Sequence, residues 1–176
     1  MAESAFIAHV PEAEPHVAHL RGQFDPSAKL GVPAHITLLY PFMSPELLSA
    51  SVFERVRVIV SRSRRFVFTL SRVDRFPGVV YLAPDPAAPF MELTRRLVNQ
   101  FPQFLPYGDA HEAIVPHLTV ARGSDAENSR VEAELRESLS DGIACTCSEV
   151  VLIENASGRW RQMHAFPLAP SAHVAG

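Results

Sequence analysis

Two short stretches of the chain share a pattern of residues that could perform acid–base chemistry. They read His35-Ile36-Thr37-Leu38 and His117-Leu118-Thr119-Val120, one in each half of a 176-residue chain, and a proline lies just upstream of each. Apolar and β-branched residues around each histidine predict buried strands. Because side chains on a strand alternate between its faces, the histidine and threonine of each stretch share one face. Each strand therefore presents an imidazole and a hydroxyl group on a common surface.

Two imidazoles that face each other across a groove form an acid–base pair. The unperturbed pKa of histidine lies near neutrality, so a neutral ring can accept a proton while a protonated ring donates one. The hydroxyl groups of Thr37 and Thr119 could bind the non-bridging oxygens of a phosphate and stabilise charge in the transition state. This chemistry requires no metal and no other cofactor. The sequence does not determine whether His35 or His117 is the base.

The paired motifs resemble those of the 2H phosphoesterase superfamily, which includes 2'-5' RNA ligases and RNA 2',3'-cyclic phosphodiesterases. The resemblance covers most of the chain, and weaker similarity extends over Arg21–Pro41 and Trp160–Pro167. It implies an RNA-processing hydrolase or ligase that opens 2',3'-cyclic phosphate or 2'-5' phosphodiester bonds of RNA ends or small nucleotides. Neither the natural substrate nor the direction of the reaction follows from the motifs. The resemblance assigns catalysis to the four motif side chains, which are His35, Thr37, His117 and Thr119.

Three further residues near the motifs are candidates for substrate binding. Arg122 resembles the arginine that follows the second motif in RNA ligase-like members, and it could hold a phosphate through two hydrogen bonds. Tyr40 or Phe42 could stack on a base. Strict alternation places Arg122 and Tyr40 on the face opposite the motif histidines. We therefore expect the strands to end there, so that these side chains turn back to the groove.

The loop from Pro102 to Ile114 leads into the second motif and contains several polar side chains. Loops beside catalytic strands often shape a pocket, which makes Tyr107, Asp109, His111 and Glu112 further candidates.

Two other functions fit parts of the pattern. A metal-dependent hydrolase would need carboxylates at ligand spacing, and only the region of His111 and Glu112 could add to the paired histidines. A non-catalytic module could bind a nucleotide or an RNA end in the same groove, using the threonines and Arg122 alone. The presence of both histidines favours the enzyme, because binding alone does not require a facing acid–base pair.

The elements that must position these residues alternate between strands and helices. Pattern and turn signals predict strands and helices over most of the chain. The expected strands are Ser4–Val10, His35–Phe42, Arg65–Phe76, Val79–Leu82, the second motif, Ile143–Asn155 and Arg159–Phe166. The expected helices are Glu12–Gln23, Ser44–Ser61, Pro89–Phe101 and Gly123–Leu139, and a loop is expected between Asp25 and Pro33.

This order predicts an α+β fold with two lobes. We expect two mainly antiparallel sheets that face a central groove, with helices outside and a pseudo-two-fold arrangement. Residues 1–176 form a single domain in this prediction, and each lobe supplies one His-x-Thr strand. The resemblance further implies that each motif strand is central in its lobe.

Composition limits the partners and the compartment. The net charge of −3 excludes a broad basic field of the kind that binds long duplexes, but it permits a nucleotide or a short RNA end with a cyclic phosphate. Cys145 and Cys147 share a face of one strand, where disulfide geometry is poor. With no basic, apolar leader at Met1 and no run long enough to span a membrane, we expect a cytoplasmic protein that does not bind membranes. We expect a monomer, although the sequence does not determine the oligomeric state.

Overall fold

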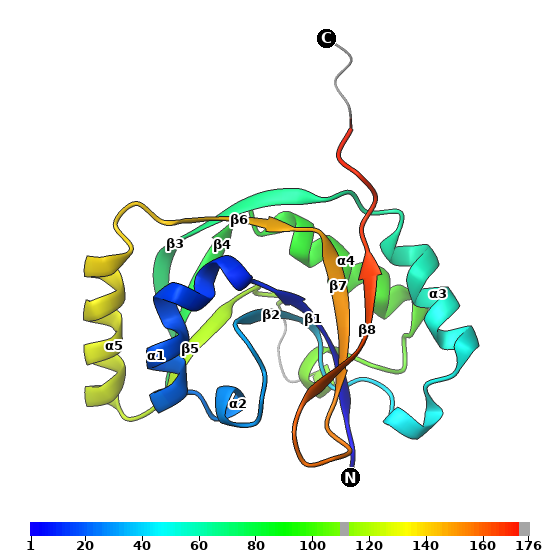
Figure 1. Ribbon diagram of the computed structural model, residues 1–176, viewed down its shortest axis with the longest axis horizontal. Coiled ribbons are helices and arrows are strands. Elements are labelled where there is room, and N and C mark those ends of the chain that lie inside the picture. The colour runs from blue at the N-terminus through cyan, green and yellow to red at the C-terminus, as the bar shows by residue number, and fades with distance from the viewer. Residues whose placement is uncertain (110–112, 173–176) are drawn as a thin grey trace.

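Two four-stranded antiparallel sheets form the framework of the protein in a computed structural model that describes residues 1–109 and 113–172 (Figure 1). Every pairing between neighbouring strands is antiparallel, which confirms the predicted α+β class. The first sheet has the order β2-β1-β7-β8, with β1 Ser4–His9, β2 His35–Leu39, β7 Glu149–Glu154 and β8 Arg161–Pro167. The second sheet has the order β5-β4-β3-β6, with β3 Phe66–Phe76, β4 Val79–Asp85, β5 Leu118–Arg122 and β6 Ile143–Cys147.

Helices cover the outer faces of both sheets, and two of them cross between the lobes. Helix α1, which follows β1 of the first sheet, contacts β5 of the second sheet. Helix α4, which follows β4 of the second sheet, contacts β2 of the first sheet. Figure 1 shows α1 beside α5 at one end of the molecule and α3 beside α4 at the other. The helices are α1 Glu14–Phe24, α2 Pro26–Lys29, α3 Ala50–Val60, α4 Ala88–Gln100 and α5 Asp125–Ser138.

The motif strands β2 and β5 are edge strands, so the expectation that each is central in its lobe is wrong. Each is the first strand in its sheet order, and the two strands contact each other. An edge strand has a neighbour on only one side, so strands from different sheets can approach directly. A central strand would be kept away from the other lobe by its own neighbours. The edge positions therefore bring the two motifs together.

Three predicted elements differ from the structure. The strand predicted from Ile143 to Asn155 is two strands in different sheets, because the chain passes from β6, paired with β3, to β7, paired with β1. Apolar periodicity does not report which partner a strand has. The helix predicted from Ser44 instead begins at Ala50, where the Ser49 side chain accepts a hydrogen bond from the Val52 backbone. The predicted loop after Asp25 contains the single helical turn α2.

Apolar residues fill the space between each sheet and its helices. Phe6, Ile36, Leu118 and Val120 are fully buried in this core, and the last three alternate with the histidines and threonines along the motif strands. Across the described residues, no helix combines the length and apolar character needed to cross a membrane.

Candidate active site

The groove between β2 and β5 contains both His-x-Thr pairs. It has a volume of about 300 Å³, and His35, Thr37, His117 and Thr119 all line it. Strands β1 and β7, which belong to the same sheet as β2, contribute apolar lining residues, among them Ile7 and Ile153. The structure therefore gathers all four predicted catalytic side chains at one surface.

The two imidazole rings are held by the same backbone contact. Nδ1 of His35 lies 2.7 Å from the carbonyl oxygen of Pro33, and Nδ1 of His117 lies 2.7 Å from the carbonyl oxygen of Val115. Since a carbonyl oxygen only accepts, each Nδ1 carries the proton and donates it. The neutral ring then has its lone pair on Nε2. Each strand start thus sets the tautomer of the histidine that it presents.

Burial makes His35 a weak base that is neutral at pH 7. Loss of solvent lowers its pKa from the usual 6.5 to about 4, although part of the ring reaches the groove surface. The Pro33 carbonyl and the charge of Asp25 oppose this shift, whereas Arg21 and His9 add to it. A neutral His35 with its lone pair on Nε2 can accept a proton.

Tyr107 joins the groove from the loop before the second motif. Its hydroxyl is hydrogen-bonded to the Thr37 side chain, and its backbone N–H donates to the Tyr40 carbonyl oxygen over 2.6 Å. Burial raises the pKa of Tyr107, which therefore carries its phenolic proton at pH 7. Its φ of 52° lies in the left-handed region, which is uncommon for a side chain of this size. Tertiary contacts thus hold Tyr107 against the threonine of the first motif.

The three predicted substrate-binding residues have different positions. Arg122 and Tyr40 both line the groove, as expected for side chains at strand ends. The Tyr40 hydroxyl donates to Glu3 over 2.9 Å. Phe42 lies in the core, only 5% exposed, and packs against Phe101 and other rings. The expectation that Phe42 could stack on a base is therefore wrong, because the chain beyond β2 turns this ring inward.

The region proposed for a metal site is only partly described. His111 and Glu112 lie outside the described residues, and so does the side chain of Asp109. Among residues that are described, no three His, Cys, Asp or Glu side chains gather as a ligand group.

Cys145 and Cys147 are buried free thiols, and burial raises the pKa of both to about 12. Neither thiol is a nucleophile at neutral pH.

Two aromatic residues that the sequence did not single out for binding, Trp160 and Phe76, flank the histidines. Trp160 lines the groove beside Tyr40, with ring centres 6.1 Å apart. On the other side, Phe76 lines a second hollow of about 580 Å³ that also includes His117 and Arg122. The Phe76 ring meets the His117 ring edge to face at 5.0 Å. The available sequence signal was that each of them lies close to a turn in the chain, since loops and turns often carry binding side chains.

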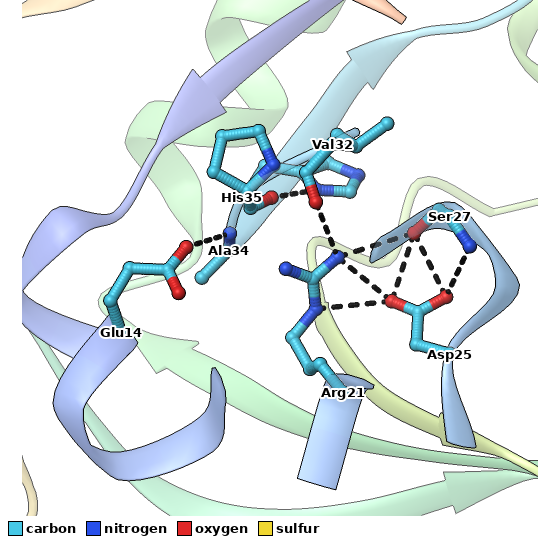
Figure 2. A network of polar contacts seen from close by, with 8 residues as sticks. Glu14, Arg21, Asp25, Ser27, Val32, Ala34 and His35 are labelled. Atoms are coloured by element: carbon cyan, nitrogen blue, oxygen red, sulfur yellow. Dashed lines mark hydrogen bonds and ion pairs between the residues drawn. The ribbon is translucent and has the colours of Figure 1, made fainter. Parts of the chain in front are cut away.

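A buried ion pair lies beneath the loop that leads to His35. Arg21 and Asp25 are 2% and 0% exposed and are bonded to each other, as Figure 2 shows. In the sequence, Arg21 stands out only as the start of a weakly similar stretch. A charged pair four residues apart on a helix is usually a surface pair, so nothing local indicated its burial.

The fold and the groove define a class of two-lobed proteins in which each lobe contributes one His-x-Thr pair. Residues 10–159 match the model of the 2'-5' RNA ligase superfamily. The chain belongs to this family, also known as the 2H phosphoesterases, and the family and its named relatives indicate a phosphoesterase.

Relatives from two Bacillus species carry the name phosphoesterase. The Bacillus cytotoxicus protein is 33% identical over 121 residues, covering 66% of this chain and 67% of the relative. The Bacillus cereus AH820 protein is 33% identical over 122 residues, with the same coverage.

Solved structures share the fold at low sequence identity. E. coli LigT with 3'-AMP has a TM-score of 0.57 at 20% identity, covering 96% of this chain and 98% of LigT. Protein TT0787 of Thermus thermophilus has a TM-score of 0.57 at 15% identity, covering 97% of this chain and 100% of TT0787. These likenesses show a common fold.

Proposed function

We propose that the protein is a metal-independent phosphoesterase that opens 2',3'-cyclic phosphate or 2'-5' phosphodiester bonds of nucleotides or RNA ends. The observation that carries the proposal is the pair of matched histidines, His35 and His117, in one groove with the same tautomer. A site that only binds phosphate gains nothing from two identically oriented imidazoles. An acid–base catalyst needs both.

The surroundings of His35 support its role as the base in hydrolysis. Neutral at pH 7, His35 takes a proton from water at Nε2 as the water oxygen attacks phosphorus. The bond between phosphorus and one ribose oxygen breaks, and protonated His117 donates a proton to that oxygen. In ligation, a ribose or terminal hydroxyl replaces water, and the same two groups act in the same directions.

Threonine and arginine side chains at the groove would stabilise the phosphate during this step. The hydroxyl groups of Thr37 and Thr119 share the histidine faces of their strands and can donate to the non-bridging oxygens. Arg122 lines both hollows that meet at His117, so it can contact the phosphate from either side. Together these groups offset the negative charge that grows on the phosphoryl oxygens.

Aromatic surfaces beside the histidines favour a nucleotide as the substrate. Trp160 and Tyr40 on one side, and Phe76 on the other, offer rings on which a base can stack. E. coli LigT, which shares the fold, has been crystallised with 3'-AMP, with ATP and with NADP+. We therefore propose that a nucleoside occupies the groove next to the reacting phosphate.

The test is the turnover of nucleoside 2',3'-cyclic phosphates with EDTA present. We expect activity in wild type and a loss of roughly 10²- to 10⁴-fold in His35→Ala and in His117→Ala, the range for removal of a general acid or base. His16→Ala is the matched control, because His16 is an exposed histidine on α1. The pH dependence of kcat/KM should have an acidic limb near the pKa of His35, about 4.

Other outcomes would contradict the proposal in distinct ways. Binding of nucleotides without turnover of a cyclic phosphate or a 2'-5' linkage would indicate a binding module. Turnover abolished by EDTA would indicate a metal-dependent hydrolase.

A further inference from the structure

The charges of Arg21 and Asp25 are withdrawn from solvent. Nε and Nη2 of Arg21 lie 3.0 and 2.9 Å from Oδ2 of Asp25. Among the ion pairs of residues 1–109 and 113–172, this is the pair in which both side chains are buried. Burying two charges costs free energy that their attraction often fails to recover. A role beyond helix stability would account for such a pair.

Both partners bind the loop of residues 25–34, which leads to the first motif. Asp25 accepts hydrogen bonds from the backbone N–H and the hydroxyl of Ser27, at 3.0 and 2.8 Å. Arg21 donates from Nη2 to the Val32 carbonyl oxygen over 3.1 Å and to the Ser27 hydroxyl over 3.2 Å. The ion pair therefore holds the start and the end of this loop at one buried point (Figure 2).

The end of the loop places the backbone carbonyl that orients His35. Val32 is followed by Pro33, whose carbonyl oxygen accepts from Nδ1 of His35. Glu14 holds the same peptide from its other side, because it accepts a hydrogen bond from the Ala34 N–H. The following peptide is held by the Val10 N–H, which donates to the Ala34 carbonyl oxygen. A shift at Val32 would rotate the Pro33 carbonyl and release the ring.

We propose that Arg21 and Asp25 are positioning residues for His35, acting through the 25–34 loop that presents the Pro33 carbonyl to its ring. The inference rests on the proposed function, in which His35 is the base. It explains why a buried charged pair lies under one motif. It also makes the protonation of His35 depend on two charged side chains that do not contact the substrate.

Opposite charges should act in opposite directions on the protonation of His35. Arg21→Gln removes a positive charge and keeps the hydrogen bonds between Asp25 and Ser27, so the pKa of His35 should rise. Asp25→Asn leaves Arg21 charged, so the same pKa should fall. The double variant should restore a value near wild type. Among the described residues, the other titratable or charged groups around the ring are His9 on β1 and Tyr40, Tyr107, His117 and Arg122 around the groove.

The experiment has two readouts, one of which needs no turnover. Nuclear magnetic resonance of ¹⁵N-labelled imidazoles reports the tautomer and the pKa of His35 without substrate. Kinetics with nucleoside 2',3'-cyclic phosphates report kcat and the acidic limb of kcat/KM. We expect shifts of roughly 0.5 to 1 pH unit in opposite directions for the two single variants. Both should also lower kcat by about 10- to 100-fold, as a displaced catalytic group does.

Arg21→Lys keeps the positive charge, and it is the variant to test if the neutral variants do not fold. An ammonium group cannot bond Asp25, Ser27 and Val32 in the geometry of the guanidinium fork, so kcat should fall while the acidic limb stays in place. The matched control is Arg57→Gln, which breaks an exposed ion pair on α3 with Glu54.

Two results would overturn the inference. One is an unchanged His35 tautomer and pKa in both neutral variants; the other is a wild-type kcat in Arg21→Lys. If wild type shows the expected tautomer and the expected shifts occur, but no cyclic phosphate or 2'-5' linkage is turned over, the proposed function fails while the positioning of His35 stands.

Discussion

The two motif histidines share a backbone contact, but their surroundings differ. His35 lies above a buried ion pair and opposite His9 in the β1–β2 pairing. His117 instead packs edge-on against Phe76 and Tyr81, with ring centres 5.0 and 5.4 Å away. The shared contact sets the tautomer of each ring, whereas charged groups surround His35 and aromatic rings pack against His117. Similar motifs can therefore take unlike roles.

The lowered pKa of His35 has a consequence for stability at acid pH. A pKa near 4 in the folded state, against 6.5 when unfolded, means that the unfolded state binds a proton first. Stability that is present above pH 6.5 is therefore lost as the pH falls toward 4. We expect wild type to lose about 2 kcal/mol more than His35→Gln over this range, a value reduced for partial exposure of the ring. Urea unfolding at pH 7 and at pH 4 measures the difference, and equal losses in the two proteins would contradict it.

At the scale of elements, the loop before β2 packs against the β7–β8 connection. The backbone N–H of Trp160 donates to the Leu30 carbonyl oxygen over 2.8 Å. Gly31 has a φ of 100°, and a Cβ there would lie 3.0 Å from the Trp160 carbonyl oxygen. This approach joins two walls of the groove that are distant in the sequence. A glycine is required both by the backbone angle and by the space.

Gly31→Ala should therefore lower both the stability of the fold and the activity more than a comparable glycine replacement elsewhere. Gly78 is the matched control, because its φ of 74° is also positive but a Cβ there meets nothing within 4 Å. We expect Gly78→Ala to cost about 1 kcal/mol from backbone strain, and Gly31→Ala roughly 1 kcal/mol more, with a lower kcat/KM. Thermal unfolding and steady-state kinetics measure both. Equal effects on stability and activity would show that the contact with Trp160 is unimportant.

At the scale of the molecule, charge bears on the size of the substrate that we propose for the groove. The net charge is −3, and Arg122 is the sole lysine or arginine among the described residues that line the groove and the adjacent Phe76 hollow. A protein that follows a long backbone presents a row of such cations. The distribution fits a substrate recognised mainly at one phosphate and its neighbouring nucleosides.

The dependence of binding affinity on salt concentration tests whether the protein contacts mainly one phosphate. Each phosphate contact to a single strand contributes about −0.7 to the slope of log affinity against log salt, so we expect a slope of about −1 for a short RNA with a 2',3'-cyclic phosphate end. Arg122→Gln should flatten the slope, and Arg57→Gln on α3 should not. A longer RNA should give nearly the same slope. A much steeper slope for the longer RNA would reveal an extended binding surface.

The sequence by itself determined the motif strands, the alternation that places each histidine with its threonine, and the α+β class. These features depend on local periodicity and on turn residues, so they are readable from neighbours in the chain. The same rules placed Tyr40 and Arg122 at strand ends, from which both reach the groove.

Only the tertiary structure decided how these pieces meet. It placed β2 and β5 at sheet edges, divided the segment of residues 143–155 between two sheets, and turned Phe42 into the core. It also buried Arg21 with Asp25 under His35. Each of these outcomes depends on contacts between residues far apart in the chain. Local pattern carries no information about such partners, and it is burial among them that lowers the pKa of His35.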